Sequence, residues 1–166
     1  MADSAPELTG LIRTASALDD SSRPPAAVPP IFLGPGVDTA VVVEKRTQTL
    51  RLYRRAHDGT LFLERTYPCT TGASAGAKES RGDQRTPDGA YFVTGVLSGD
   101  RLPTRYGALA LPLSYPNAWD KRLGRSGYGI WLHGSDRLSA PFTRRDTKGC
   151  VILRNDDLTS LARRIA

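Results

Sequence analysis

The sequence has little of what marks several common functional classes. Its 166 residues include two cysteines, two histidines and one methionine. The cysteines and histidines lack the paired short spacings of a zinc site, so no metal or other cofactor is predicted. No apolar run is long enough to cross a bilayer, so membrane contact is not indicated.

The chain also has fewer acidic residues than basic residues. The net charge is +6, and the basic residues are mostly arginines dispersed along the chain. They form no Lys/Arg-rich cluster and no aromatic RNA-binding motif, so nucleic acid is not predicted as a partner. The charge favours acidic partners in general. With 39% hydrophobic and 24% charged residues, the chain has the composition of one globular domain.

The chain divides into three parts. Residues 1–20 place apolar side chains at helical spacing, which predicts a short N-terminal helix. Residues 21–36 contain five prolines and are predicted to be an extended linker. Residues 37–166 form the domain proper. The start of the chain lacks the basic and apolar regions of a secretory leader.

Within the domain, β-branched and aromatic runs predict a mainly β fold, a sandwich or barrel with one or two short helices. Three consecutive antiparallel strands are expected at 39–44, 49–53 and 61–67, with Asp58-Gly59 as a hairpin turn. A further strand is predicted at 90–96 and a helix after Asn155. Residues 70–85 are predicted to form a mobile loop and 97–128 a substrate-covering lid, because both are rich in turn residues.

A histidine and a cysteine lie at the ends of two short apolar runs. His133 follows Ile130-Trp131-Leu132, and Cys150 precedes Val151-Ile152-Leu153. The polar stretch between them lets the two strands lie side by side, which brings an imidazole near a thiol. An imidazole that takes the thiol proton makes the sulfur a nucleophile. Gly149 and Cys150 could donate backbone N–H groups to an oxyanion, and the Gly134 carbonyl could orient His133.

These residues carry a resemblance to a known family. His133-Gly134, followed by T-K-G-C-V-I-L-R-N at 147–155, resembles the signature of the L,D-transpeptidase catalytic domain, the YkuD-like family of bacterial cell-wall enzymes. Lys148 stands where many members have a second His, and Ile152 where many have Arg or Asn, as in the YafK-like subgroup. The segments R-T-P-D-G-A-Y at 85–91, Tyr106-Gly107 and Y-P-N at 115–117 also resemble the family.

The resemblance implies a cysteine enzyme of the periplasm or cell envelope that acts on peptidoglycan stem peptides. A secretory leader is then expected to be missing from this sequence. Cys150 would form a thioester at meso-diaminopimelate, with His133 as base, and no cofactor is implied. An amine acceptor gives L,D-transpeptidation, including attachment of a wall-tethered protein. Water gives carboxypeptidase action or release of such a tether.

The other candidate residues have both functional and structural interpretations. The substrate-binding candidates are Arg154, Lys148, Thr147, Tyr115, Trp119, Tyr106 and Ser135. Arg154 and Lys148 either recognise stem-peptide carboxylates or are solvated charges. Cys69 is expected in the core, with a disulfide to Cys150 as the alternative. A non-catalytic wall-binding module and a cytosolic cysteine protease are the remaining functional alternatives.

Overall fold

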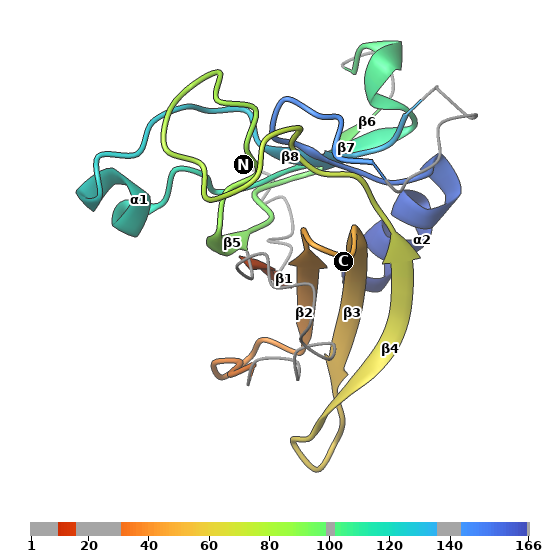
Figure 1. The fold of residues 1–166 in the computed structure, drawn as a ribbon. Coiled ribbons are helices and arrows are strands. Elements are labelled where there is room, and N and C mark those ends of the chain that lie inside the picture. The colour runs from red at the N-terminus through yellow and green to blue at the C-terminus, as the bar shows by residue number, and fades with distance from the viewer. Residues whose placement is uncertain (1–9, 16–30, 99–101, 136–143, 166) are drawn as a thin grey trace, which may run out of the picture.

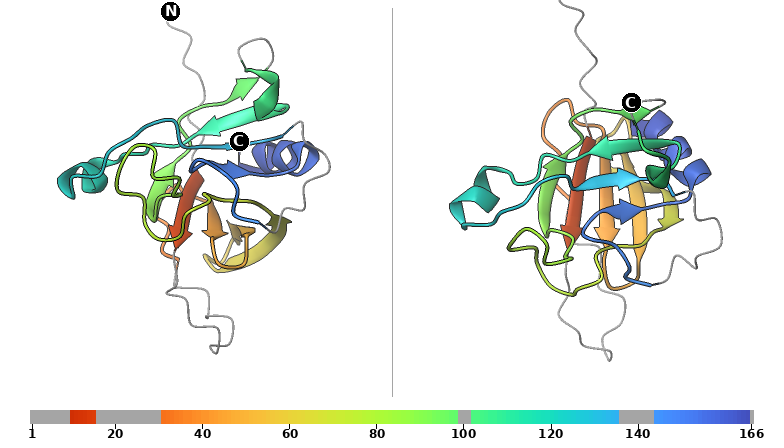
Figure 2. Two further views of the ribbon diagram at one scale, coloured as in Figure 1. Left: turned by 45° about the horizontal axis from the view of Figure 1, so that its top comes forward. Right: turned by 90° about the horizontal axis from the view of Figure 1, so that it is seen from above.

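The computed structural model describes residues 10–15, 31–98, 102–135 and 144–165, and it contains two β-sheets and two short helices (Figures 1 and 2). The strand orders are β4-β3-β2-β1-β5 and β6-β7-β8-β9. The predicted mainly β fold with one or two helices is therefore confirmed. The predicted linker lies mostly outside the described residues.

The first sheet contains the predicted three-strand meander. Its members are β2 (Thr39–Glu44), β3 (Thr49–Arg55) and β4 (Leu61–Pro68), and each pairs antiparallel with the next. Gly59 has φ +85°, as the tight turn between β3 and β4 requires. The core-facing side chains of β2 and β3, such as Val41 and Leu52, are fully buried.

The prediction of an N-terminal helix is wrong for the part of it that the structure describes. Residues Gly10–Ala15 form strand β1, which pairs parallel with β2 and antiparallel with β5 (Gly89–Phe92). Backbone pairing with strands on both sides outweighs the weak helical preference of so short a segment. The rest of residues 1–20 lies outside the described ranges.

The second sheet holds the two strands that flank the Cys and the His. Its strands are β6 (Leu97–Ser98), β7 (Leu109–Pro112), β8 (Trp131–His133) and β9 (Val151–Ile152). Strands β8 and β9 lie side by side, as predicted, and their pairing is parallel. Helix α2 (Asn155–Ile165) contacts β7 and β8 and buries Leu158, Leu161 and Ile165 in the core.

The prediction that residues 97–128 lack strands and helices is wrong for the part that the structure describes, because this segment contains β7 and α1 (Ala118–Arg122). Strand β7 lies inside the sheet between β6 and β8, and Ala110 and Leu111 are fully buried. Helix α1 begins with a capping box between Asn117 and Asp120 and projects from the body of the molecule (Figure 1). A four-residue strand that ends in proline has too weak a pattern to be recognised in the sequence.

Single bridges join the two sheets at both ends. Thr70, just beyond β4, pairs with Ile152 of β9, and Val93, just beyond β5, pairs with Leu113 beyond β7. One core cluster consequently contains side chains from both sheets and from α2. None of the helices in the described ranges is long and apolar enough to span a membrane.

Candidate active site

The parallel pairing of β8 with β9 brings the predicted base and nucleophile to one face of the sheet. Leu132 lies opposite Val151, and both side chains are fully buried in the core. Because side chains alternate along a strand, His133 and Cys150 flank this pair on the other face. The sheet thus presents an imidazole and a thiol on neighbouring strands.

His133 is held in one tautomer. Its Nδ1 lies 2.5 Å from the Gly134 carbonyl oxygen. A carbonyl oxygen only accepts hydrogen bonds, so Nδ1 carries the proton and Nε2 keeps its lone pair. The side chain is 5% exposed, and burial lowers its pKa, although the bond to Gly134 opposes the change. The imidazole is therefore neutral at neutral pH, with the Nε2 lone pair available to accept a proton.

Tyr106 covers the His133 ring. The ring centroids lie 4.9 Å apart at an interplanar angle of 88°. Tyr106 also lies against Trp131, with ring centroids 5.0 Å apart. The Arg105 guanidinium lies over the Tyr106 ring, 4.7 Å from its centroid. This aromatic packing limits the access of water to the imidazole.

Cys150 is a partly exposed thiol. Its Sγ donates a hydrogen bond of 3.4 Å to the Gly129 carbonyl oxygen. Burial raises the pKa of the Cys150 thiol, while the Trp131 N–H and the positive charge of Lys78 oppose that rise. The resting pair is consequently a neutral thiol and a neutral imidazole. Attack on a carbonyl requires proton transfer from sulfur to His133.

Thr147 shapes the turn that carries the cysteine. Its hydroxyl donates to the Cys150 carbonyl oxygen at 2.6 Å and accepts from the Gly149 N–H at 3.0 Å. The Gly149 N–H, which was predicted to donate to an oxyanion, is thus engaged by Thr147 in this conformation. Gly149 has φ +127°, and an added Cβ would lie 2.8 Å from the Arg85 carbonyl oxygen.

The predicted substrate-binding residues lie in different environments. Tyr115 is 6% exposed and belongs to the core. It packs against Tyr91, and its hydroxyl donates to the Ser126 carbonyl oxygen. Trp119 is 63% exposed on α1. Ser135 is half-buried, whereas Lys148 and Arg154 are exposed on either side of β9.

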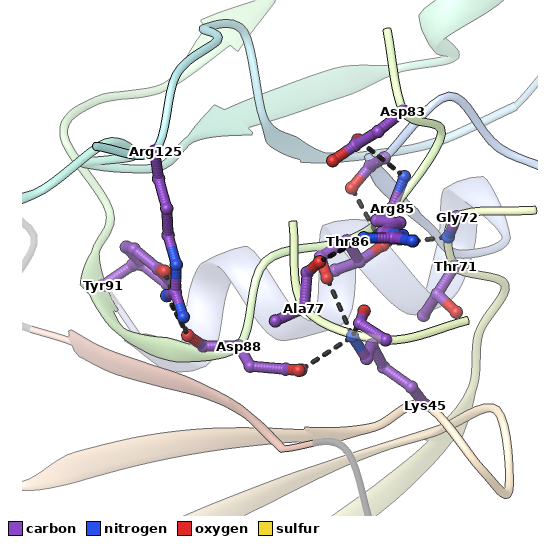
Figure 3. Close-up of polar contacts among 12 residues, drawn as sticks. Lys45, Thr71, Gly72, Ala77, Asp83, Arg85, Thr86, Asp88, Tyr91 and Arg125 are labelled. Atoms are coloured by element: carbon purple, nitrogen blue, oxygen red, sulfur yellow. Dashed lines mark hydrogen bonds and ion pairs between the residues drawn. The ribbon is translucent and has the colours of Figure 1, made fainter. Parts of the chain in front are cut away.

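A buried lysine that the sequence analysis did not anticipate lies behind Thr86 and Asp88. Lys45 donates to the carbonyl oxygens of Gly76 at 2.6 Å and Thr86 at 2.8 Å, and it forms an ion pair with Asp88 at 2.7 Å (Figure 3). Desolvation lowers its pKa, and Asp88 opposes the shift. In the sequence, Lys45 directly follows strand β2, a position typical of a solvated lysine. Its buried contacts are therefore visible only in the tertiary structure.

Residues 70–85, predicted to be a mobile loop, are anchored at many points. Lys78 is 3% exposed and forms an ion pair with Asp83 at 2.6 Å. Burial alone would raise the pKa of Asp83, but Lys78 and three backbone N–H groups hold it well below its usual range. Ala73 and Thr71 exchange backbone hydrogen bonds with Asp146 and Thr147. The segment therefore supports the cysteine turn.

Both thiols of the chain are free. Both Cys69 and Cys150 are unpaired, and Cys69 is fully buried, with its pKa raised by burial to about 12. Within the part of the chain that the structure describes, no three His, Cys, Asp or Glu side chains are grouped as a metal site would require.

The fold and the site match one enzyme family. The family model of the L,D-transpeptidase catalytic domain (YkuD) matches residues 38–166. The chain belongs to this family.

Individual relatives agree with that assignment. YafK of Escherichia coli (strain K12) is 29% identical over 100 residues, which is 60% of this chain and 39% of that protein. Bd1075 of Bdellovibrio bacteriovorus is 36% identical with a TM-score of 0.63, covering 76% of this chain and 43% of that one. The helical cell shape determining protein Pgp2 of Campylobacter jejuni is 30% identical with a TM-score of 0.67, covering 77% and 44%. The chain thus spans less than half the length of these relatives.

Proposed function

We propose that the protein is an L,D-transpeptidase that forms a thioester between Cys150 and meso-diaminopimelate of a peptidoglycan stem. The observation that carries this proposal is the His133 tautomer. Its Nδ1 is bound to Gly134, so the lone pair of Nε2 is available on the same sheet face as Cys150. A thiol without a base on that face would remain protonated, because burial raises its pKa.

The reaction follows from this arrangement. The Cys150 sulfur attacks the carbonyl carbon of diaminopimelate as its proton passes to His133 Nε2. The developing oxyanion takes a hydrogen bond from the Cys150 N–H. Collapse of the intermediate breaks the amide bond, and the imidazolium protonates the departing amine of the terminal D-residue. The thioester then transfers its acyl group to an acceptor.

The acceptor is an amine in this proposal, either on a second stem peptide or on a wall-tethered protein. Exposed cations beside the cysteine fit a substrate that carries several carboxylates. Lys148 lies next to the turn, and Arg154 lies at the far end of β9. We assign both to stem-peptide carboxylates, for which an arginine fork is well suited. The action on wall peptides places the enzyme in the cell envelope.

Incubation with a purified disaccharide tetrapeptide tests the proposal. With an added D-amino acid, mass spectrometry should show exchange of the terminal D-alanine or a cross-linked dimer. Loss of D-alanine without exchange would instead identify a carboxypeptidase. Cys150→Ala should abolish every product, whereas the matched control Cys69→Ala should retain activity. Products that persist in Cys150→Ala would refute the cysteine mechanism.

A further inference from the structure

Thr86 connects the loop that precedes β5 to the turn that carries the cysteine. Its side chain is 1% exposed and lies beside Gly72 (Figure 3). The Gly72 N–H donates to Thr86 Oγ1 at 2.8 Å, and Thr86 Oγ1 donates to the Gly149 carbonyl oxygen at 2.9 Å. A hydroxyl has one proton, so acceptance from Gly72 and donation to Gly149 define its orientation.

The Gly149 carbonyl belongs to the same peptide unit as the Cys150 N–H. That unit is planar and trans, so its C=O and N–H point in opposite directions. By binding the carbonyl oxygen, Thr86 directs the Cys150 N–H to the opposite side of the peptide plane. The orientation of this N–H matters because the other N–H of the turn, from Gly149, is bound to Thr147.

This peptide unit needs an external constraint. Gly149 has no Cβ and adopts φ +127°, so no side chain of its own restricts the torsions on either side of it. Thr86 is itself fixed, because Lys45 binds its carbonyl oxygen at 2.8 Å. Gly72 approaches so closely that an added Cβ would lie 2.3 Å from the Gln84 carbonyl oxygen. The hydroxyl therefore has little freedom to follow a rotating peptide.

We propose that Thr86 is a positioning residue that locks the Gly149–Cys150 peptide plane and thereby aims the Cys150 N–H at the oxyanion. This role rests on the proposed function, in which Cys150 is the nucleophile. It assigns to Thr86 an effect on reactions that pass through a tetrahedral oxyanion. Reactions of the same sulfur that form no oxyanion are unaffected.

Two reactions of Cys150 separate these effects. In acetylation by p-nitrophenyl acetate, a C–S bond forms, an oxyanion develops, p-nitrophenolate leaves, and the thiol proton passes to His133. In alkylation by iodoacetamide, the sulfur displaces iodide with no oxyanion. The rates are compared in the wild type, Thr86→Val and Thr86→Ser, and peptide mass spectrometry assigns each label to Cys150 or Cys69.

The valine variant keeps the shape of the side chain but loses the hydroxyl. Its acetylation should be roughly tenfold or more slower, because removal of one oxyanion donor costs about 10²–10³ in rate. Its alkylation should stay within about twofold of the wild type, and Thr86→Ser should acetylate at close to the wild-type rate. If Thr86→Val does not fold, as judged by circular dichroism, the same two rates are measured in Thr86→Ala.

Three results would overturn the proposal. Acetylation at the wild-type rate in the hydroxyl-free variant would show that the peptide plane needs no lock. An equal loss in acetylation and alkylation would show only a structural role. A wild-type Cys150 that acetylates no faster than Cys69 would refute the proposed function itself, and this failure is recognised in the unmutated protein.

Discussion

At position 48, a glycine variant should be more stable to unfolding than an alanine variant. Gln48 is 6% exposed and adopts φ +53°, which is rare for a residue with a Cβ. Its Nε2 donates to the Lys45 carbonyl oxygen at 2.6 Å and to Thr71 Oγ1 at 2.7 Å, and its Oε1 accepts from the Thr71 N–H at 2.8 Å. The side chain thus joins the β2–β3 turn to the segment under the cysteine turn.

The size of the effect follows from these contacts. Loss of three buried hydrogen bonds at about 1 kcal/mol each lowers the free energy of unfolding by about 3 kcal/mol in Gln48→Ala. Gln48→Gly loses the same bonds but relieves the left-handed backbone, which costs a non-glycine residue about 1 kcal/mol. The glycine variant should therefore be more stable than the alanine variant by about 1 kcal/mol.

Urea denaturation measures both differences from the transition midpoints and slopes. Gln84→Gly is the matched control, because Gln84 also has a positive φ, +58°, but an exposed side chain. This control should be more stable than the wild type by about 1 kcal/mol. An alanine variant of Gln48 at least as stable as the glycine variant would refute the argument from backbone conformation.

Three further predictions concern the reacting groups. Gly149→Ala should slow acetylation of Cys150 by roughly 10²-fold, because the Gly149 φ of +127° excludes a Cβ. The control Gly124→Ala, at φ +71°, should leave the acetylation rate unchanged. Equal rates in both variants would contradict this prediction. Tyr106→Ala should raise the pKa of His133 toward its ordinary value, moving the acid limb of kcat/KM to higher pH, while Tyr106→Phe leaves the limb in place. An unmoved limb in the alanine variant would count against shielding by the ring. The rate of Cys150 alkylation should rise with pH to a midpoint above about 8.5, since burial raises the thiol pKa. A reactive plateau at neutral pH would instead indicate a resting thiolate–imidazolium pair.

His133 and Cys150 could be recognised in the sequence as a candidate catalytic pair because each residue adjoins an apolar run. The runs at 130–132 and 151–153 predict buried strands, and pairing of the strands places His133 near Cys150. The bond from His133 to Gly134 was also anticipated. The engagement of the Gly149 N–H was not, because it depends on the rotamer of Thr147, which no sequence pattern specifies.

The parts of the fold that could not be predicted are those defined by pairing at long range. Strand β1 is a strand because β2 and β5 bind both of its edges, and its helical spacing of apolar residues is misleading. Strand β7 has four residues and ends in Pro112, so its pattern resembles a turn. The sequence around Lys45 and Thr86 does not indicate which groups they contact, because their partners lie up to 63 residues away.

The contacts that shape the cysteine turn form only when segments far apart in the sequence meet. The bond from Thr86 to Gly149 joins residues 63 positions apart, and the Thr70–Ile152 bridge closes an even longer loop. Loop closure over such distances carries an entropic cost and slows folding. The shape of the cysteine turn therefore depends on contacts between segments that are far apart in the chain. A chain in which these distant segments have not yet come together lacks the contacts that shape the turn around Cys150, so the proposed acyl transfer requires the folded molecule.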